Sequence, residues 1–184
     1  RIMKNIRSHI LGLALIIIAL PAESPAQSLA TDISQNLISI TSNFAGAEIL
    51  LFGTISQKGD IVIVVQGPNE QLLVRRKKQI ARVWVNRKTL VFSNVPAYYA
   101  VASNRSLKDI GSKELLKKYN MKADLLRFIV FNSTEIPSEE LNAFREALVR
   151  NKRTQNLYFE SENTVSFNGN LFRSSIKFPA NAPE

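Results

Sequence analysis

Short hydrophobic runs recur through the first half of the chain, with turn-forming residues between them. They lie at 37–44, 47–55, 60–67, 71–77, 81–85, 89–95 and 98–103. Short runs separated by Gly, Pro and Asn are typical of an antiparallel β-sandwich. The run at 61–65 is apolar on both faces, which predicts a central strand covered from both sides. Tyr98 and Tyr99 are neighbours on a predicted strand, so they must face opposite sides.

A hairpin is predicted near the C-terminal end. Asn168 and Gly169 both tolerate positive φ and mark a two-residue turn between apolar segments. The strand that follows alternates apolar and basic residues, as a half-buried strand requires: Phe172, Ile176 and Phe178 against Arg173 and Lys177.

Two segments have helical patterns. The first, 111–120, offers Ser112 as an N-cap and carries lysines near its end. The second, 136–152, is acidic in its first turn and basic in its last, and it should lie against the sheet. Its apolar stripe is formed by Leu141, Phe144 and Leu148. We therefore predict a mainly β fold, an antiparallel immunoglobulin-like β-sandwich with two short helices packed on it.

The N-terminal segment has the layout of a secretory signal peptide. Three basic residues precede an eleven-residue apolar run at 10–20, and small residues follow up to Ala26. A bilayer-spanning helix needs about 20 apolar residues, so a cleaved signal is favoured over a permanent anchor, and a buried core helix is the alternative. The predicted organisation is a signal peptide at 1–26, a β-sandwich core at 27–107 and a helix-containing β region at 108–184.

Composition and charge limit the class of partner. The chain has 184 residues, of which 45% are hydrophobic and 21% charged, as expected of a folding domain. Its formal net charge is +9, and removing residues 1–26 takes away three basic side chains and one acidic, which leaves +7. This surplus favours anionic partners. Export makes nucleic acid an unexpected partner, so none is predicted.

The residue types needed for several chemistries are missing. The sequence has no cysteine, and its one histidine, His9, lies in the predicted signal. Disulfides, Ser-His-Asp or Cys-His catalysis and the usual zinc sites are therefore excluded within the predicted mature chain. Asp32, Glu48, Asp60 and Glu70 show no spacing typical of a carboxylate pair. We expect neither an enzyme nor a cofactor.

A strongly basic stretch runs from 72 to 88, with seven Lys or Arg residues, no acidic residue and one Trp. Four of the basic residues are consecutive, and a strand covered on both faces would bury two of those charges. We therefore expect an edge strand or a protruding hairpin end. The charges either prevent edge-to-edge pairing or contact an anionic membrane surface or glycan, at about 1 kcal/mol per basic residue. The candidate binding residues are Arg75, Arg76, Lys77, Lys78, Trp84 and Arg87; of these, Trp84 is also expected in the core.

Four short signatures occur in a fixed order: ISITSNF at 38–44, WVN at 84–86, VPAYYAVAS at 95–103 and PANAPE at 179–184. With these, the chain resembles the alpha-proteobacterial transmembrane protein family, most specifically over 38–107. The resemblance implies a signal peptide, an extracytoplasmic β-rich region on the periplasmic side of the inner membrane, and one C-terminal membrane helix. It also implies that this chain stops before that helix, so that the strand ending near Phe178 lacks a partner.

Three function classes follow. The first, which we expect, is a non-catalytic extracytoplasmic domain of a membrane-anchored protein that binds an inner-membrane protein such as a transporter. The second is a module that binds an anionic ligand, namely a lipid headgroup, a glycan or a small oxyanion, through the basic stretch. The third is an enzyme with a Ser-Lys or carboxylate site, which the missing His and Cys disfavour.

Overall fold

The computed structural model describes residues 28–36, 44–80, 83–131 and 136–182. The predicted signal peptide and most of the ISITSNF signature lie outside these residues. The backbone of the basic stretch is described except at 81–82, whereas the side chains of 77–87, which include four candidate binding residues, lie outside the description.

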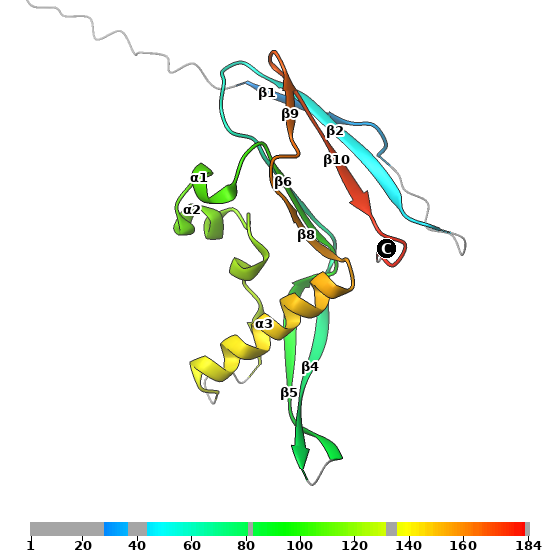
Figure 1. Ribbon diagram of the computed structural model, residues 1–184, viewed down its shortest axis with the longest axis vertical. Helices are drawn as coiled ribbons and strands as arrows, with labels where there is room; N and C mark the ends of the chain where they lie inside the picture. Colours follow the sequence, from blue (N-terminus) through cyan, green and yellow to red (C-terminus); the bar gives the residue numbers. More distant parts are fainter. Residues whose placement is uncertain (1–27, 37–43, 81–82, 132–135, 183–184) are drawn as a thin grey trace, which may run out of the picture.

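Strands dominate the described chain (Figure 1). They are β1 (Leu29–Ile33), β2 (Ala47–Ile55), β3 (Val62–Gln66), β4 (Asn69–Ile80), β5 (Val83–Pro96), β6 (Tyr99–Ser103), β7 (Ile129–Val130), β8 (Tyr158–Ser161), β9 (Ser166–Asn168) and β10 (Leu171–Phe178). The helical segments are α1 (Leu107–Ile110), α2 (Lys113–Lys118), the 3₁₀ turn η1 (Ala123–Leu125) and α3 (Ser138–Thr154).

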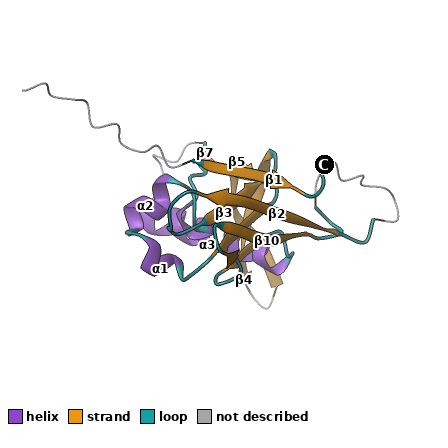
Figure 2. Cartoon of the chain, turned by 90° about the horizontal axis from the view of Figure 1, so that it is seen from above, coloured by secondary structure: helices purple, strands orange, loops and turns teal. Residues whose placement is uncertain are grey.

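The strands form sheets in the order β1-β2-β10-β9, β3-β6-β8 and β4-β5-β7. The first two sheets pack face to face, and the helices gather on the far side of the second (Figures 1 and 2). The predicted mainly β, antiparallel sandwich with helices packed on it is confirmed. One pair, β6 with β8, is parallel, because the helical segments between them carry the chain back to the same end of the sheet.

Strand β6 separates two hydrophobic clusters, and each of its five residues is buried. Just before it, Tyr98 belongs to the cluster between the sheets, and its hydroxyl donates to the Lys177 carbonyl at 2.7 Å. Tyr99 belongs to the cluster beneath the helices and donates to the Asn120 carbonyl at 2.6 Å. Burial raises the pKa of both phenols, so both remain donors. The expectation that the two rings face opposite sides is confirmed.

The prediction that 61–65 forms a central strand is wrong in one respect. Strand β3 lies at the edge of its sheet, and β6 occupies the centre. Both faces of β3 are nevertheless covered, with Ile63 and Val65 towards the first sheet and Val62 and Val64 towards the helices. An apolar run indicates that both faces of a strand are buried. It does not indicate whether the strand lies at the centre or at the edge of its sheet.

Three other strand predictions are corrected. Residues 83–85 and 89–95, from two separate predicted runs, belong to one strand, β5, and the strand β1 was not predicted. The hairpin turn is displaced by one position, because Asn168 pairs with Leu171 and leaves Gly169 and Asn170 in the loop. Gly169 has φ of 61°, and both favoured forms of the two-residue hairpin turn require positive φ at this first loop position.

A continuous two-stranded ribbon leads from the sandwich into a long hairpin. At the corner between them, Gly67 N–H donates to the Tyr98 carbonyl and Ala97 N–H donates to the Pro68 carbonyl, both at 2.8 Å. A Cβ on Gly67 would lie 3.1 Å from Tyr98, so the two strands approach closely there. Beyond this corner β4 and β5 project from the body (Figure 1).

A buried lysine ties α3 to this corner. Lys152 is 5% exposed, and its ammonium pairs with the Glu70 carboxylate at the start of β4. The same ammonium donates to the Ala97 carbonyl at 3.2 Å and lies 5.9 Å from the centroid of the Tyr158 ring. The helix, the root of the hairpin and β8 therefore meet at one charge.

We expect Lys152→Met to destabilise the protein by about 2 to 3 kcal/mol, because it leaves Glu70 unpaired and Ala97 without a donor. Urea unfolding followed by circular dichroism measures the change. Arg150→Met, on the exposed side of the same helical turn, is the matched control. Equal stability of the two variants would contradict the assignment.

Candidate functional site

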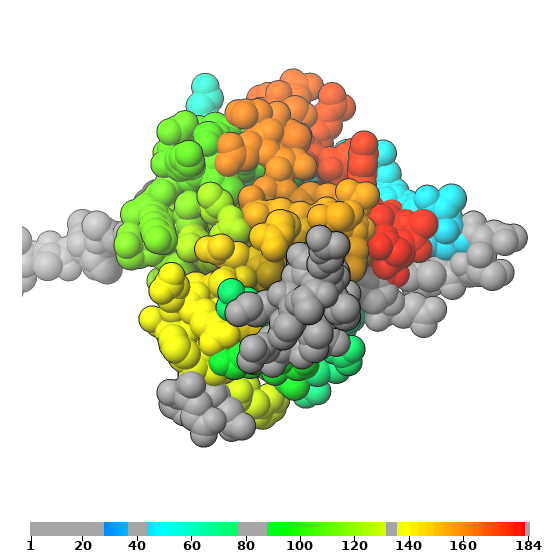
Figure 3. Space-filling model, turned by 60° about the horizontal axis from the view of Figure 1, so that its bottom comes forward, coloured from blue at the N-terminus to red at the C-terminus, as the bar shows by residue number. Residues whose placement is uncertain are grey.

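The sheet β4-β5-β7 has one face covered by α3. Leu90 and Phe92 of β5 are buried in the same cluster as Phe144 and Leu148 of the helix, as the predicted stripe on α3 requires. Figure 3 shows α3 in yellow beside the green residues of the hairpin. This contact holds α3 against the hairpin.

The opposite face of this sheet, which we call the outer face, exposes large apolar side chains. Leu73 is 62% exposed and Ile129 is 58% exposed. They pair across the sheet with Val91 and Ser93, two residues apart on β5, so they share one face. Phe131, in the turn after β7, is 59% exposed. Two large apolar side chains, Leu73 and Ile129, thus lie on the side of the sheet away from α3.

The predicted placement of the basic stretch is confirmed. Strand β4 is an edge strand, the hairpin projects, and Arg75 and Arg76 are exposed. Arg75 pairs with Thr89 on the outer face, two positions from Leu73. The side chains of Lys77, Lys78, Trp84 and Arg87 lie outside the described residues.

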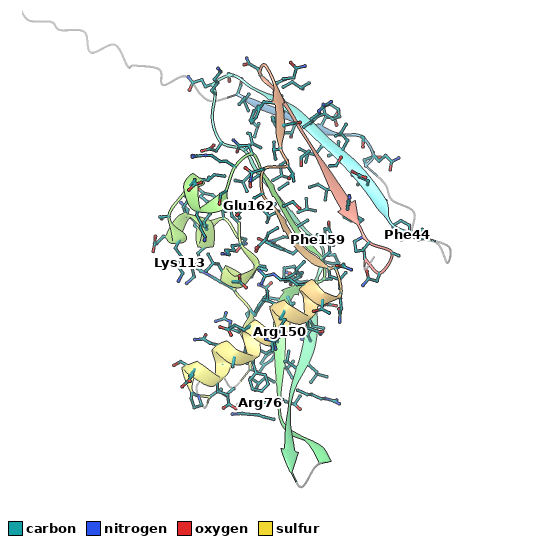
Figure 4. The ribbon with its side chains drawn as sticks, viewed as in Figure 1. Phe44, Arg76, Lys113, Arg150, Phe159 and Glu162 are labelled. Carbon is teal, nitrogen blue, oxygen red and sulfur yellow. The ribbon has the colours of Figure 1, made fainter. Side chains whose placement is uncertain are left out.

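Two basic residues of the stretch are paired within the molecule. Lys88 Nζ lies 2.7 Å from Glu140 in the first turn of α3, and Arg76 Nη1 lies 3.7 Å from the same carboxylate. Figure 4 labels Arg76 on β4 and Arg150 on α3, where the helix and the hairpin lie together. The Glu140 carboxylate therefore holds the hairpin to the helix, and Arg76 serves packing at least as much as binding.

A polar cleft at the root of the hairpin was missed by the sequence analysis. It has a volume of about 600 Å³, and its lining includes Gln66, Asn69, Asn94, Lys117, Lys118 and Arg127. Asn69 donates to Asn94 at 2.8 Å, and Asn94 has φ of 59°. The lining comes from the ribbon, α2 and the segment after η1. Because these segments are far apart in the sequence, no local motif predicts the cleft. The cations and amides of this cleft suit an oxyanion ligand, whereas the Glu114 carboxylate in the same lining disfavours one.

Two of the carboxylates named in the sequence analysis, Asp60 and Glu70, are paired with basic side chains. Arg105 Nε donates to Asp60 at 2.7 Å, and this hydrogen bond lowers the pKa of Asp60. Glu70 is paired with Lys152. Within 28–36, 44–80, 83–131 and 136–182, no three His, Cys, Asp or Glu residues lie close enough to hold a metal ion.

The fold and this surface define a mainly β domain that presents a projecting hairpin. A family model described as "Putative transmembrane protein (Alph_Pro_TM)" matches residues 28–184, and the chain belongs to this family. The resemblance inferred from the four signatures is thereby confirmed. A search of curated proteins found no match, and neither did a search of solved structures. Among the helices that the structure describes, none is long and apolar enough to cross a membrane.

We expect Glu140→Gln to lower the free energy of unfolding by about 0.5 to 1 kcal/mol, because two partly exposed cations lose their partner. The loss should shrink in high salt, since screening weakens the original pairs. Urea unfolding at low and high NaCl concentration tests both statements. Glu139→Gln, at the neighbouring exposed position, is the control, and an equal loss there would contradict the assignment.

Proposed function

We propose that this chain is a non-catalytic extracytoplasmic domain of a membrane-anchored protein, and that it binds an inner-membrane partner protein through the outer face of the hairpin. A transporter is one such partner. The observation that carries the proposal is the exposure of Leu73 and Ile129 on the face that α3 leaves open.

The chemistry of the outer face suits a protein partner. Scattered apolar residues are common on surfaces, but neighbouring large ones on a single sheet face favour an interaction site. Burying a side chain such as Leu, Ile or Phe contributes about 1.5 to 3 kcal/mol. Arg75 beside them fits the enrichment of arginine and aromatic residues at interfaces.

The ion pairs that hold the hairpin in place also support the proposal. Lys152 holds its root and Glu140 holds its flank to α3. A surface that is ordered before binding loses little conformational freedom on association, so more of the contact energy remains as affinity.

Location rests on different support. The basic start, the short apolar run and the small residues before Ala26 are typical of an export signal. The family description supplies association with a membrane. Anchorage by a C-terminal helix on the periplasmic side is the arrangement that combines the two.

A second candidate function is binding of an anionic ligand, and the cleft at the hairpin root favours it. Lys117, Lys118 and Arg127 line this cleft together with Asn69 and Asn94. The basic stretch itself was the sequence-based site for this function. The cleft is better enclosed, because it has walls from three parts of the chain.

The outer face is tested by cross-linking in native membranes, with the partner identified by mass spectrometry. We expect the double variant Leu73→Ser, Ile129→Ser to reduce the amount of cross-linked partner at least tenfold, because two anchoring side chains are removed. Leu29→Ser replaces a leucine that is 59% exposed on β1, in another sheet, and should recover the partner fully. Undiminished recovery with the double variant would refute this interface.

A further inference from the structure

Strand β10 has an open edge along part of its length. Strand β2 pairs with all of it, from Leu171 to Phe178. On the other side, β9 pairs only with Leu171, Phe172 and Arg173. From Ser174 to Phe178, no second strand of the described chain pairs with β10.

The hydrogen-bonding groups on this edge can be assigned from the ladder. Ile55 N–H donates to the Asn170 carbonyl at 3.0 Å, so the even-numbered residues of β10 bond towards β2. The odd-numbered residues, including Ser175 and Lys177, point the other way. The Lys177 carbonyl already accepts a hydrogen bond from the Tyr98 hydroxyl. Within the described residues, the N–H of Lys177 and both backbone groups of Ser175 have no partner.

A groove runs along the same edge. It has a volume of about 610 Å³ and lies between β10 and the strands β6 and β8. Ala102 and Phe159 form part of its wall, and Figure 4 labels Phe159 on the strand beside β10. Ser174 lines it too, is 2% exposed, and its Oγ has no hydrogen-bond partner among the described residues. Buried hydroxyls are normally paired, so this atom marks a place where a partner group fits.

Charge selects the kind of occupant. Arg173 and Lys177 are exposed, two positions on either side of Ser175. If two copies of β10 paired antiparallel about Ser175, Arg173 of one copy would lie opposite Lys177 of the other, and like charges opposite each other are destabilising. An extended segment with carboxylates at alternate positions meets both cations instead.

We propose that this edge binds an extended, acidic segment of a partner polypeptide as an added β-strand. The segment pairs with Ser175 and with the Lys177 N–H, as in recognition by strand addition. Its alternate side chains are small and face the groove, where one reaches Ser174 Oγ, and the intervening carboxylates lie opposite Ser175 and Lys177, beside the side chains of Arg173 and Lys177. The site is separate from the outer face of the hairpin, so neither proposal depends on the other.

The probe is an acetylated, amidated hexapeptide with aspartate at its first, third and fifth positions, valine at the second and fourth, and serine at the last, so that an antiparallel strand ends opposite Ser174 and does not meet β9. The ¹⁵N-labelled chain is titrated with it, and amide hydrogen exchange is compared with and without peptide. We expect the exchange of the Ser175 and Lys177 amides to slow at least tenfold at saturation. A peptide with lysine in place of aspartate should bind at least tenfold more weakly. Protection elsewhere, or equal binding of the two peptides, overturns the proposal.

Two variants of one residue test the backbone contact. Ser175→Pro removes an N–H from the open edge without removing a bond to β2, and we expect at least tenfold weaker binding. Ser175→Ala keeps the N–H and should bind as the wild type does. Unchanged binding by a folded Ser175→Pro chain refutes strand addition. The exchange measurement on the wild type decides the matter if that variant does not fold.

A last pair of variants separates the groove from the hairpin. Ser174→Ala removes the unpartnered hydroxyl, and we expect it to weaken binding of the peptide that ends in serine more than binding of one that ends in alanine. Leu73→Ser should leave peptide binding unchanged. A loss of peptide binding with Leu73→Ser would place the peptide on the hairpin and overturn the proposal.

Discussion

The arrangement of this molecule depends on one buried charge. The ammonium of Lys152 lies where the sandwich ribbon turns into the hairpin, and it pairs with Glu70 on one strand and with the Ala97 carbonyl on the other. Removing a charge from water is unfavourable unless its partners are well placed, so the ribbon and the helix adopt the one geometry that satisfies it. The direction of the hairpin, and with it the outer face, follows from that geometry.

The same ribbon serves the core and the surface. Inside the body, β3 and β6 carry apolar residues on both faces, because the first sheet covers one side and the helices cover the other. Past the corner only one face is covered, by α3, and the other is left to solvent with Leu73 and Ile129 on it. Where the cover ends, apolar side chains of the β4-β5-β7 sheet become exposed.

Much of the local structure could be predicted from the sequence. Ser112 caps α2 by accepting from the Leu115 N–H, and Phe172 and Ile176 are buried between exposed residues on β10. The basic stretch lies on an edge strand because four consecutive charges fit no covered one. These features depend on local periodicity and on single residues, and a sequence displays both.

What the sequence did not reveal depends on contacts between distant segments. Lys152 looked like an ordinary helix-end charge, yet it is buried because Glu70, 82 positions away, meets it. The cleft at the hairpin root and the groove beside β10 are each lined from several separate segments. The parallel pairing of β6 with β8 and the edge position of β3 cannot be recognised from the residues of these strands alone.

The central claim is that Lys152 sets the direction of the hairpin, and a distance measurement tests it most directly. The chain has no cysteine, so a variant with Arg75→Cys on β4 and Thr54→Cys on β2 takes up spin labels at these two positions only. Double electron–electron resonance should give one narrow distance distribution with Lys152 in place, and a broad or shifted one in the Lys152→Met background. An equally narrow, unshifted distribution in both would contradict the account.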